Sequence, residues 1–239
     1  MDYSEKYYQE VEKILALVKA NEKEKIGQSA ELLSKSIISG NIAHIFGTGH
    51  SEMACKEVFT RAGSLSCIRI IGVHYELEKF ERLEGMAEII LSDYEIRINE
   101  PVLIISSSGI NALPIEVAMI CKERGGIVIA ITSLEHSKLV KPRHSSGKKL
   151  YEISDIIIDS HVPAGDAAVK IPGIEMKVGP VSSLAVLSII NSIVVETTAL
   201  LIEQQKIPPI RISRNMPGGD ENNQKFKDIY GTRIPELKL

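Results

Sequence analysis

Short apolar runs alternate with helical stretches along most of this chain, and this alternation restricts the possible folds more than any other feature. Five runs rich in isoleucine and valine show little polar alternation, as strands buried on both faces do; they span residues 42–46, 67–73, 102–105, 127–131 and 155–158. Between them lie helix candidates at 51–62, 82–92, 112–124 and 135–141. Alternating strands and helices connect through right-handed crossovers, so the sequence predicts an α/β protein with a parallel, doubly wound sheet.

Helical segments flank the predicted sheet at both ends. Residues 3–38 carry apolar side chains at helical spacing, which predicts one long helix or two in succession, ending at Ser39-Gly40-Asn41. Residues 180–205 form an almost wholly apolar helix candidate, expected in the core or partly in a subunit interface. The last thirty residues look irregular. We therefore expect an N-terminal helical extension at 1–40, one domain at 41–206 and an irregular C-terminal tail at 207–239.

Composition excludes several classes of partner. The chain has 239 residues, enough to bury a core without disulfide or metal support, and its three cysteines follow no metal-binding spacing. Reduced thiols favour a cytoplasmic location, and the acidic, amphipathic N-terminus leads us to expect no secretory signal. No run reaches the roughly 18 apolar residues of a membrane helix. A net charge of −3, no tryptophan and no basic cluster among aromatic residues argue against binding to nucleic acid.

Polar turns follow the first and third predicted strands. In an open parallel sheet, ligands bind at the C-terminal ends of the strands, near the switch in strand order. The first strand is followed by Gly47-Thr48-Gly49-His50-Ser51, in which the glycines allow close approach of a ligand and the hydroxyls can donate. Glu52 stands where a dinucleotide-binding motif would need a third glycine, so nicotinamide binding is not indicated.

The turn after the third strand is richer in donors. It reads Ser106-Ser107-Ser108-Gly109-Ile110-Asn111 and leads into a helix, an arrangement that predicts a phosphate cradle without a lysine. An ordinary capped turn is the alternative, although one cap needs only one serine. Further hydroxyls on the same edge come from Thr132 and Ser133, and from Ser182 and Ser183, which helix capping alone would also explain.

The two turns together resemble the G-x-G-x-S and S-x-S-G motifs of the sugar isomerase (SIS) domain family, and the likeness covers residues 40–200. Over its full length, including ERLEGMAEIIL, RHSSGKKLYEISDIIID and the GGDENN tail, the chain is similar to a bacterial group of single SIS proteins, the UPF0309 family, sometimes labelled phosphoheptose isomerase. The resemblance implies a three-layer α-β-α sandwich with a five-stranded parallel sheet, homodimers or larger homo-oligomers, and a sugar phosphate as ligand.

The resemblance also implies roles for individual residues. By matching motifs, the phosphate would be held by Ser106, Ser107, Ser108 and Asn111, around Gly109, with Thr132 or Ser133 beside it. The sugar would be bordered by Gly47, Gly49 and Ser51, with Thr48 as a further donor, and Ser182 and Ser183 would form another polar wall.

Acid–base residues are harder to assign. Isomerisation through an enediol needs a base near C1 and C2, elimination of a lactyl ether needs a similar base with an acid, and neither needs a metal or other cofactor. Glu57 lies where several SIS enzymes place an acid, and Glu84, with Glu88 as its alternative, lies in a segment that faintly resembles the E-G-A-E sequence of the N-acetylmuramic acid 6-phosphate etherase. A solvated helix surface would also explain these glutamates. His50 can contact phosphate or move protons.

Other candidates lie on loops near the same edge: His136 and His144 in a basic loop, His161, Asp166, and the pair Glu175 and Lys177. The leading expectation is a phosphosugar isomerase or lyase that uses side-chain acid–base catalysis without metal or cofactor. A phosphosugar sensor without catalytic activity and an etherase-like lyase are the alternatives, because the fold does not fix the reaction.

Overall fold

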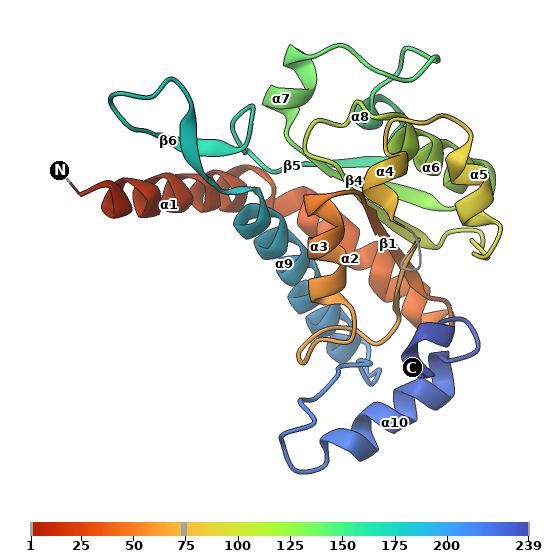
Figure 1. Cartoon of the computed structure of the whole chain (residues 1–239). Helices are drawn as coiled ribbons and strands as arrows, with labels where there is room; N and C mark the ends of the chain where they lie inside the picture. The colour runs from red at the N-terminus through yellow and green to blue at the C-terminus, as the bar shows by residue number, and fades with distance from the viewer. Residues whose placement is uncertain (1, 73–75, 239) are drawn as a thin grey trace.

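The computed structural model describes residues 2–72 and 76–238, and within them five parallel strands form one sheet in the order β2-β1-β3-β4-β5 (Figure 1). The strands are β1 (Ala43–Gly47), β2 (Ile68–Ile70), β3 (Pro101–Ile105), β4 (Ile127–Thr132) and β5 (Ile156–Asp159). This confirms the predicted α/β class and the doubly wound sheet. The last residue of the expected strand 67–73 lies outside the described residues.

Both faces of the sheet are covered, which explains why its strands are apolar throughout. On one face, Ile45 and Leu103 pack with α2 (Lys23–Ile38), α3 (His50–Val58) and α9 (Ser182–Glu203). On the other face, Phe46 and Ile104 pack with α4 (Leu77–Phe80), α5 (Met86–Leu91), α6 (Ala112–Glu123) and α8 (Leu150–Ile153). Neighbouring residues of one strand thus enter opposite cores.

The expected N-terminal helical region consists of two helices, α1 (Tyr3–Asn21) and α2, which meet at Glu22. α9 has the length and hydropathy of a membrane span. Its buried residues, Ile189 and Ile193 among them, pack against α2 and the sheet, so α9 is a core helix of this domain. Leu184, Val195 and Ile202 leave part of α9 exposed, and the expected homo-oligomer stays a prediction.

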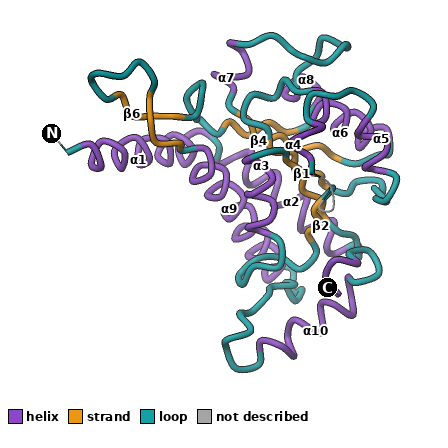
Figure 2. Tube along the Cα trace, viewed as in Figure 1, coloured by secondary structure: helices purple, strands orange, loops and turns teal. Residues whose placement is uncertain are grey.

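The C-terminal tail differs from the expectation of irregular structure, and a hairpin that was not predicted precedes α9. The tail forms α10 (Gly219–Tyr230) and a short 3-10 helix (Pro235–Lys238). Figure 2 shows α10 below the sheet. The helix forms because Phe226 and Tyr230, four residues apart, are buried on one face of it, a spacing hidden in a mainly polar sequence. Ahead of α9, a two-stranded antiparallel hairpin joins β6 (Ala167–Lys170) to β7 (Lys177–Pro180). α7 (Leu134–Leu139) follows β4.

Candidate functional site

The sheet reverses its winding between β1 and β3, because β2 lies beyond β1 while β4 and β5 lie beyond β3. Both polar turns leave the sheet at this switch point, where open parallel sheets bind ligands. They border a cleft of about 370 Å³. Its lining consists of Thr48, Gly49, His50, Ser51, Glu78, Glu81, Ser106, Ser107, Ser108, Asn111, His136, Gly165, Asp166 and Ser182.

The first turn needs both of its glycines. At Gly47, a Cβ would lie 2.8 Å from the backbone carbonyl of Ser51, so only glycine lets β1 pass this close to the start of α3. Gly49 has φ = 56°, in the left-handed region, and directs the chain into α3. The turn thereby places His50 and Ser51 on the first turn of a helix whose N-terminus faces the cleft.

The second turn offers donors that the protein does not use. Throughout the described chain, neither the backbone amides nor the hydroxyls of Ser107 and Ser108 donate a hydrogen bond to a protein acceptor. The Ser106 hydroxyl differs, since it accepts from the Gly109 amide at 3.2 Å and holds the turn in shape. Free amides and hydroxyls beside a helix start are suited to bind an anion.

Asn111 is nine-tenths buried and lines the cleft. Its Oδ1 accepts a hydrogen bond of 2.7 Å from the Arg143 guanidinium, which brings a positive charge to this turn from the basic loop. The chain supplies this charge without a lysine in the turn itself.

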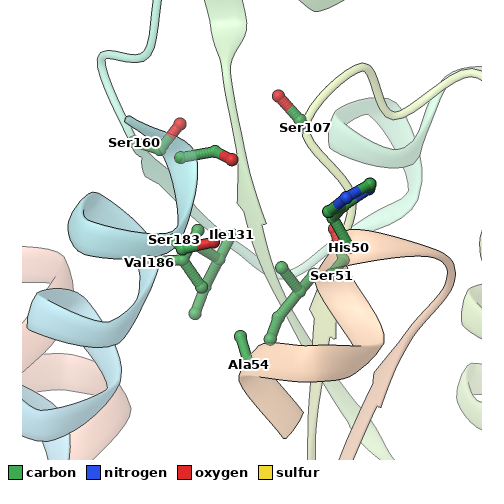
Figure 3. Close-up of a pocket in the computed structure, with 10 residues that line it drawn as sticks. His50, Ser51, Ala54, Ser107, Ile131, Ser160, Ser183 and Val186 are labelled. Carbon is green, nitrogen blue, oxygen red and sulfur yellow. The ribbon is translucent and has the colours of Figure 1, made fainter. Parts of the chain in front are cut away.

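A smaller cavity of about 20 Å³ adjoins the cleft and lies between α3 and α9. Figure 3 shows Ser51 and Ala54 of α3 on one side of it and Ser183 and Val186 of α9 on the other. Ser107 lines both spaces, so the anion turn is continuous with the gap between the two helices.

Three predicted contact hydroxyls serve the structure instead. Thr132 and Ser133 are buried behind the second turn, where Thr132 Oγ1 donates to Ser107 O at 3.2 Å and Ser133 Oγ to Val162 O at 2.6 Å. Ser182 lines the cleft, but its Oγ donates to Asp166 Oδ2 at 2.8 Å. The other carboxylate oxygen of Asp166 accepts from the amides of Val181 and Ser182, so Asp166 caps α9.

Sequence reasoning missed an acid that contacts the first turn. Glu81 follows α4, lines the cleft and accepts a hydrogen bond of 3.2 Å from Thr48 Oγ1. Its Oε2 would be 4.0 Å from a Cβ on Gly49. Thr48 is buried, so this contact fixes the carboxylate beside the turn. No local signal marks Glu81, because it reaches Thr48 across 33 residues of sequence.

The structure does not bring the predicted catalytic glutamates to the cleft. Glu57 lies toward the far end of α3, where it pairs with Arg61 and lines a separate hollow. The Glu84 carboxylate accepts hydrogen bonds from the hydroxyl and amide of Ser145, 2.7 Å each. These bonds lower the pKa of Glu84, so its carboxylate is a weaker base than that of a free glutamate. Glu88 is exposed and does not line the cleft.

The predicted histidines fall into separate settings. His50 and His136 line the cleft, whereas His161 contacts Glu22 at 3.0 Å behind it. His144 lies between Glu84 and Glu116, and their ligand atoms lie within 4.8 Å of one another, a geometry that could hold a metal ion. Within the described chain, hydrogen bonds from Ser145 and from the Gly85 amide already engage the two carboxylates.

The fold and the two turns define a SIS protein. A family model described as "SIS domain" matches residues 6–133. Curated relatives extend the match along the whole chain. A UPF0309 protein of Geobacillus kaustophilus is 36% identical over 97% of this chain and 95% of its own, and one of Caldanaerobacter subterraneus is 37% identical over 98% of both. The chain belongs to the UPF0309 family of SIS domain proteins.

Solved structures share the fold at low sequence identity. The phosphoheptose isomerase of Neisseria gonorrhoeae superposes with a TM-score of 0.60 at 16% identity, over 82% of this chain and 97% of its own. That of Francisella tularensis gives 0.58 at 14% identity, over 82% and 98%. The Vibrio vulnificus NanR protein complexed with ManNAc-6P gives 0.51 at 14% identity, over 98% of this chain and 70% of its own.

Proposed function

We propose that the cleft binds a sugar phosphate and converts it by acid–base catalysis, as a phosphosugar isomerase or a related lyase. One observation carries this proposal: the unused amides and hydroxyls of Ser107 and Ser108 open onto the same cleft as the carboxylate of Glu81. The phosphate would bind the donors of the second turn, with Arg143 and Asn111 behind it. The open-chain sugar would extend from there toward Ser51 and Glu81.

Glu81 is our candidate for the base. In an enediol mechanism it would take the proton from C2 and return it to C1, while His50, at the start of α3, would move protons between the two oxygens. Thr48 donates to one oxygen of the carboxylate and so fixes its orientation. Glu81 thus takes the role that the sequence alone assigned to Glu57 or Glu84.

Two matched variants test this assignment. A thermal-shift panel of sugar phosphates identifies a ligand, and proton exchange at C2 in heavy water reports catalysis. Glu81→Gln should lower exchange by roughly 10²–10⁴-fold and leave affinity within a few-fold, because the phosphate turn is untouched. Glu57→Gln, the same change at a residue outside the cleft, should keep exchange at the wild-type rate. Loss of exchange in Glu57→Gln with retention in Glu81→Gln would refute the assignment.

A sensor is the second candidate, because the NanR neighbour is described in complex with a sugar phosphate. Tight binding of a sugar phosphate without exchange or product in the wild-type protein would establish a sensor and refute catalysis. Release of lactate from N-acetylmuramic acid 6-phosphate would instead identify an etherase-like lyase.

A further inference from the structure

A second cleft, of about 510 Å³, lies at the far end of α3 from the sugar cleft. α3 begins at His50 in the sugar cleft and ends at Val58, next to the residues that line this second space. Its walls come from 59–62, from 211–214 and from Asn223, Glu236 and Leu237. In Figure 1, α10 and the C-terminus lie at this lower end, away from α4 and α7.

Arg211 lines this cleft and is 95% buried, with 5% of its surface exposed. Within the described part of the chain, neither Nε nor Nη1 of its guanidinium has a hydrogen-bond partner. Burial lowers the pKa of Arg211, and nearby Arg214 adds to this effect. A buried charge without a partner is costly, so proteins normally pair such a group.

Glu236, the acid in the cleft wall, pairs with Arg69 and not with Arg211. Both oxygens of Glu236 accept from Arg69, at 2.9 Å from Nη2 and 3.2 Å from Nε. The lining carries Arg61, Arg211 and Arg214 against this one glutamate. Arg61 pairs with Glu57, and Arg214 lies 3.8 Å from Asp220. An excess of positive charge therefore remains at the guanidinium of Arg211.

The backbone that carries Arg211 is held on both sides. Its amide donates to Ser64 O at 3.0 Å and its carbonyl accepts from the Gly63 amide at 2.9 Å. The Oδ1 of Asn223 accepts a hydrogen bond of 3.0 Å from the Ile212 amide, and its Nδ2 donates one of 2.7 Å to the Ile212 carbonyl. Asn222 donates to the carbonyl of the preceding residue, Ile210, at 3.0 Å.

This clamp depends on Gly219. A Cβ there would overlap the Ser213 carbonyl, so only glycine lets α10 begin so near the 211–214 segment. The M-P-G-G-D-E-N-N sequence at 216–223 thus fixes the position of one arginine. A backbone held at five polar groups, carrying a guanidinium whose Nε and Nη1 have no partner among the described residues, has the construction of a binding site.

We propose that this second cleft binds a small molecule through an oxyanion, a carboxylate or a phosphate, held by the guanidinium of Arg211. The planar fork of arginine matches two oxygens of either group. The cleft has room beyond the anion for the rest of a small metabolite. This proposal does not depend on the proposed function of the sugar cleft.

The side-chain Nε–H resonance of Arg211, recorded by ¹H–¹⁵N NMR on the full chain, gives a direct test. Arg211→Lys identifies the resonance by its loss. Titration with inorganic phosphate and, separately, with sodium acetate should move it saturably, with a Kd of about 1 mM or tighter for at least one anion. The anion that acts distinguishes a phosphate from a carboxylate ligand. Ser107→Ala, which alters the sugar cleft alone, should leave the midpoint unchanged.

Stability provides a second readout. Anion binding at either cleft raises Tm, and Ser107→Ala keeps the rise that comes from the second cleft. Arg211→Met should fold and lose that part of the rise. Arg214→Met, at an exposed arginine of the same cleft, should keep it. The proposal is overturned if neither anion moves the Arg211 resonance. It is also overturned if the resonance instead moves with protein concentration, which would assign the cleft to a contact with a second copy of the chain.

Discussion

At the C-terminal end of the sheet, serine hydroxyls and backbone amides face an open cleft, whereas at the N-terminal end Glu100 is fully buried in a closed cluster. Glu100 precedes β3, and both its oxygens are occupied. Its donors are the Ile42 amide (3.1 Å), the Arg97 amide (2.9 Å), His44 Nε2 (3.2 Å), and Arg233 Nη1 and Nη2 (3.0 Å each).

The difference separates stability from function along the same strands. Burial raises the pKa of Glu100, but the hydrogen bonds from His44, Arg233 and the two amides outweigh it and hold the pKa at about 2. The anion of this cluster is the protein's own carboxylate, whereas in the proposed function the donors of Ser107 and Ser108 would bind an anion from outside. The closed end should therefore govern folding, and the open end should govern binding.

The largest effect should come from removing the internal anion. Glu100→Leu leaves Arg233 without its main partner, and we expect a loss of about 3–5 kcal/mol in the free energy of unfolding, measured by urea denaturation. Glu95→Leu is the matched control, because exposed Glu95 also contacts Arg233 and should cost at most about 1 kcal/mol. Equal losses in the two variants would contradict the importance of the buried cluster.

Acid should weaken the closed end by a few kcal/mol. Burial lowers the pKa of His44 from 6.5, and Glu100 only partly offsets this, so the unfolded chain gains a proton first as pH falls below about 6.5. The pKa of Glu100 is lower in the folded protein, so its contribution is present above pH 4.5 and is lost as pH falls toward 2. Urea midpoints should fall steadily from pH 7.5 to pH 4. A midpoint that rises over this range would be inconsistent with the two pKa directions.

Gly109 tests the shape of the open end. Its φ is 61°, and a Cβ would lie 2.8 Å from Ser137 Oγ, so Gly109→Ala should cost about 1–2 kcal/mol of stability. Affinity for a sugar phosphate should fall more than tenfold, as measured by calorimetry. Gly147→Ala, at φ = 70° with open space around it, shares the backbone strain and should leave affinity unchanged. If both variants bind as the wild type does, the turn does not hold the phosphate.

Ser107 should give the smallest effect on folding. Ser107→Ala removes one free hydroxyl, so affinity for the sugar phosphate should fall about tenfold, or about 1.4 kcal/mol, with stability within about 0.5 kcal/mol of wild type. Ser192→Ala, on the exposed side of α9, should change neither. A variant that loses stability but keeps its affinity would show that the Ser107 hydroxyl is structural.

The sequence was sufficient to predict the sheet and the two turns because both depend on local patterns. Strands such as β3 are apolar on both faces. Each of the two turns is a short continuous run of glycines and polar residues directly after its strand, so it can be recognised in the sequence. Glu81 could not be found in this way, because its place beside Thr48 depends on a contact between residues 33 positions apart in the sequence.

Orientation also escaped prediction. Thr132 ends β4 and Ser107 follows β3 at the same edge of the sheet, yet the Thr132 side chain is buried and donates a hydrogen bond to the Ser107 carbonyl. The local backbone conformation at the end of each strand determines which hydroxyl faces the cleft. The helix α10 was missed for a related reason. Its apolar face is short, and the sequence does not show that Phe226 packs into the core of the domain.

The helix α3 joins the two clefts. Its nine residues make a rod of about 13 Å, with His50 and Ser51 at one end and the chain leading to Arg61 at the other. A short helix moves as one rigid unit, so a displacement at one end also moves the other end. If both ligands bind with different affinity to two positions of α3, the two occupancies become thermodynamically linked, and each ligand must alter the affinity of the other by the same factor.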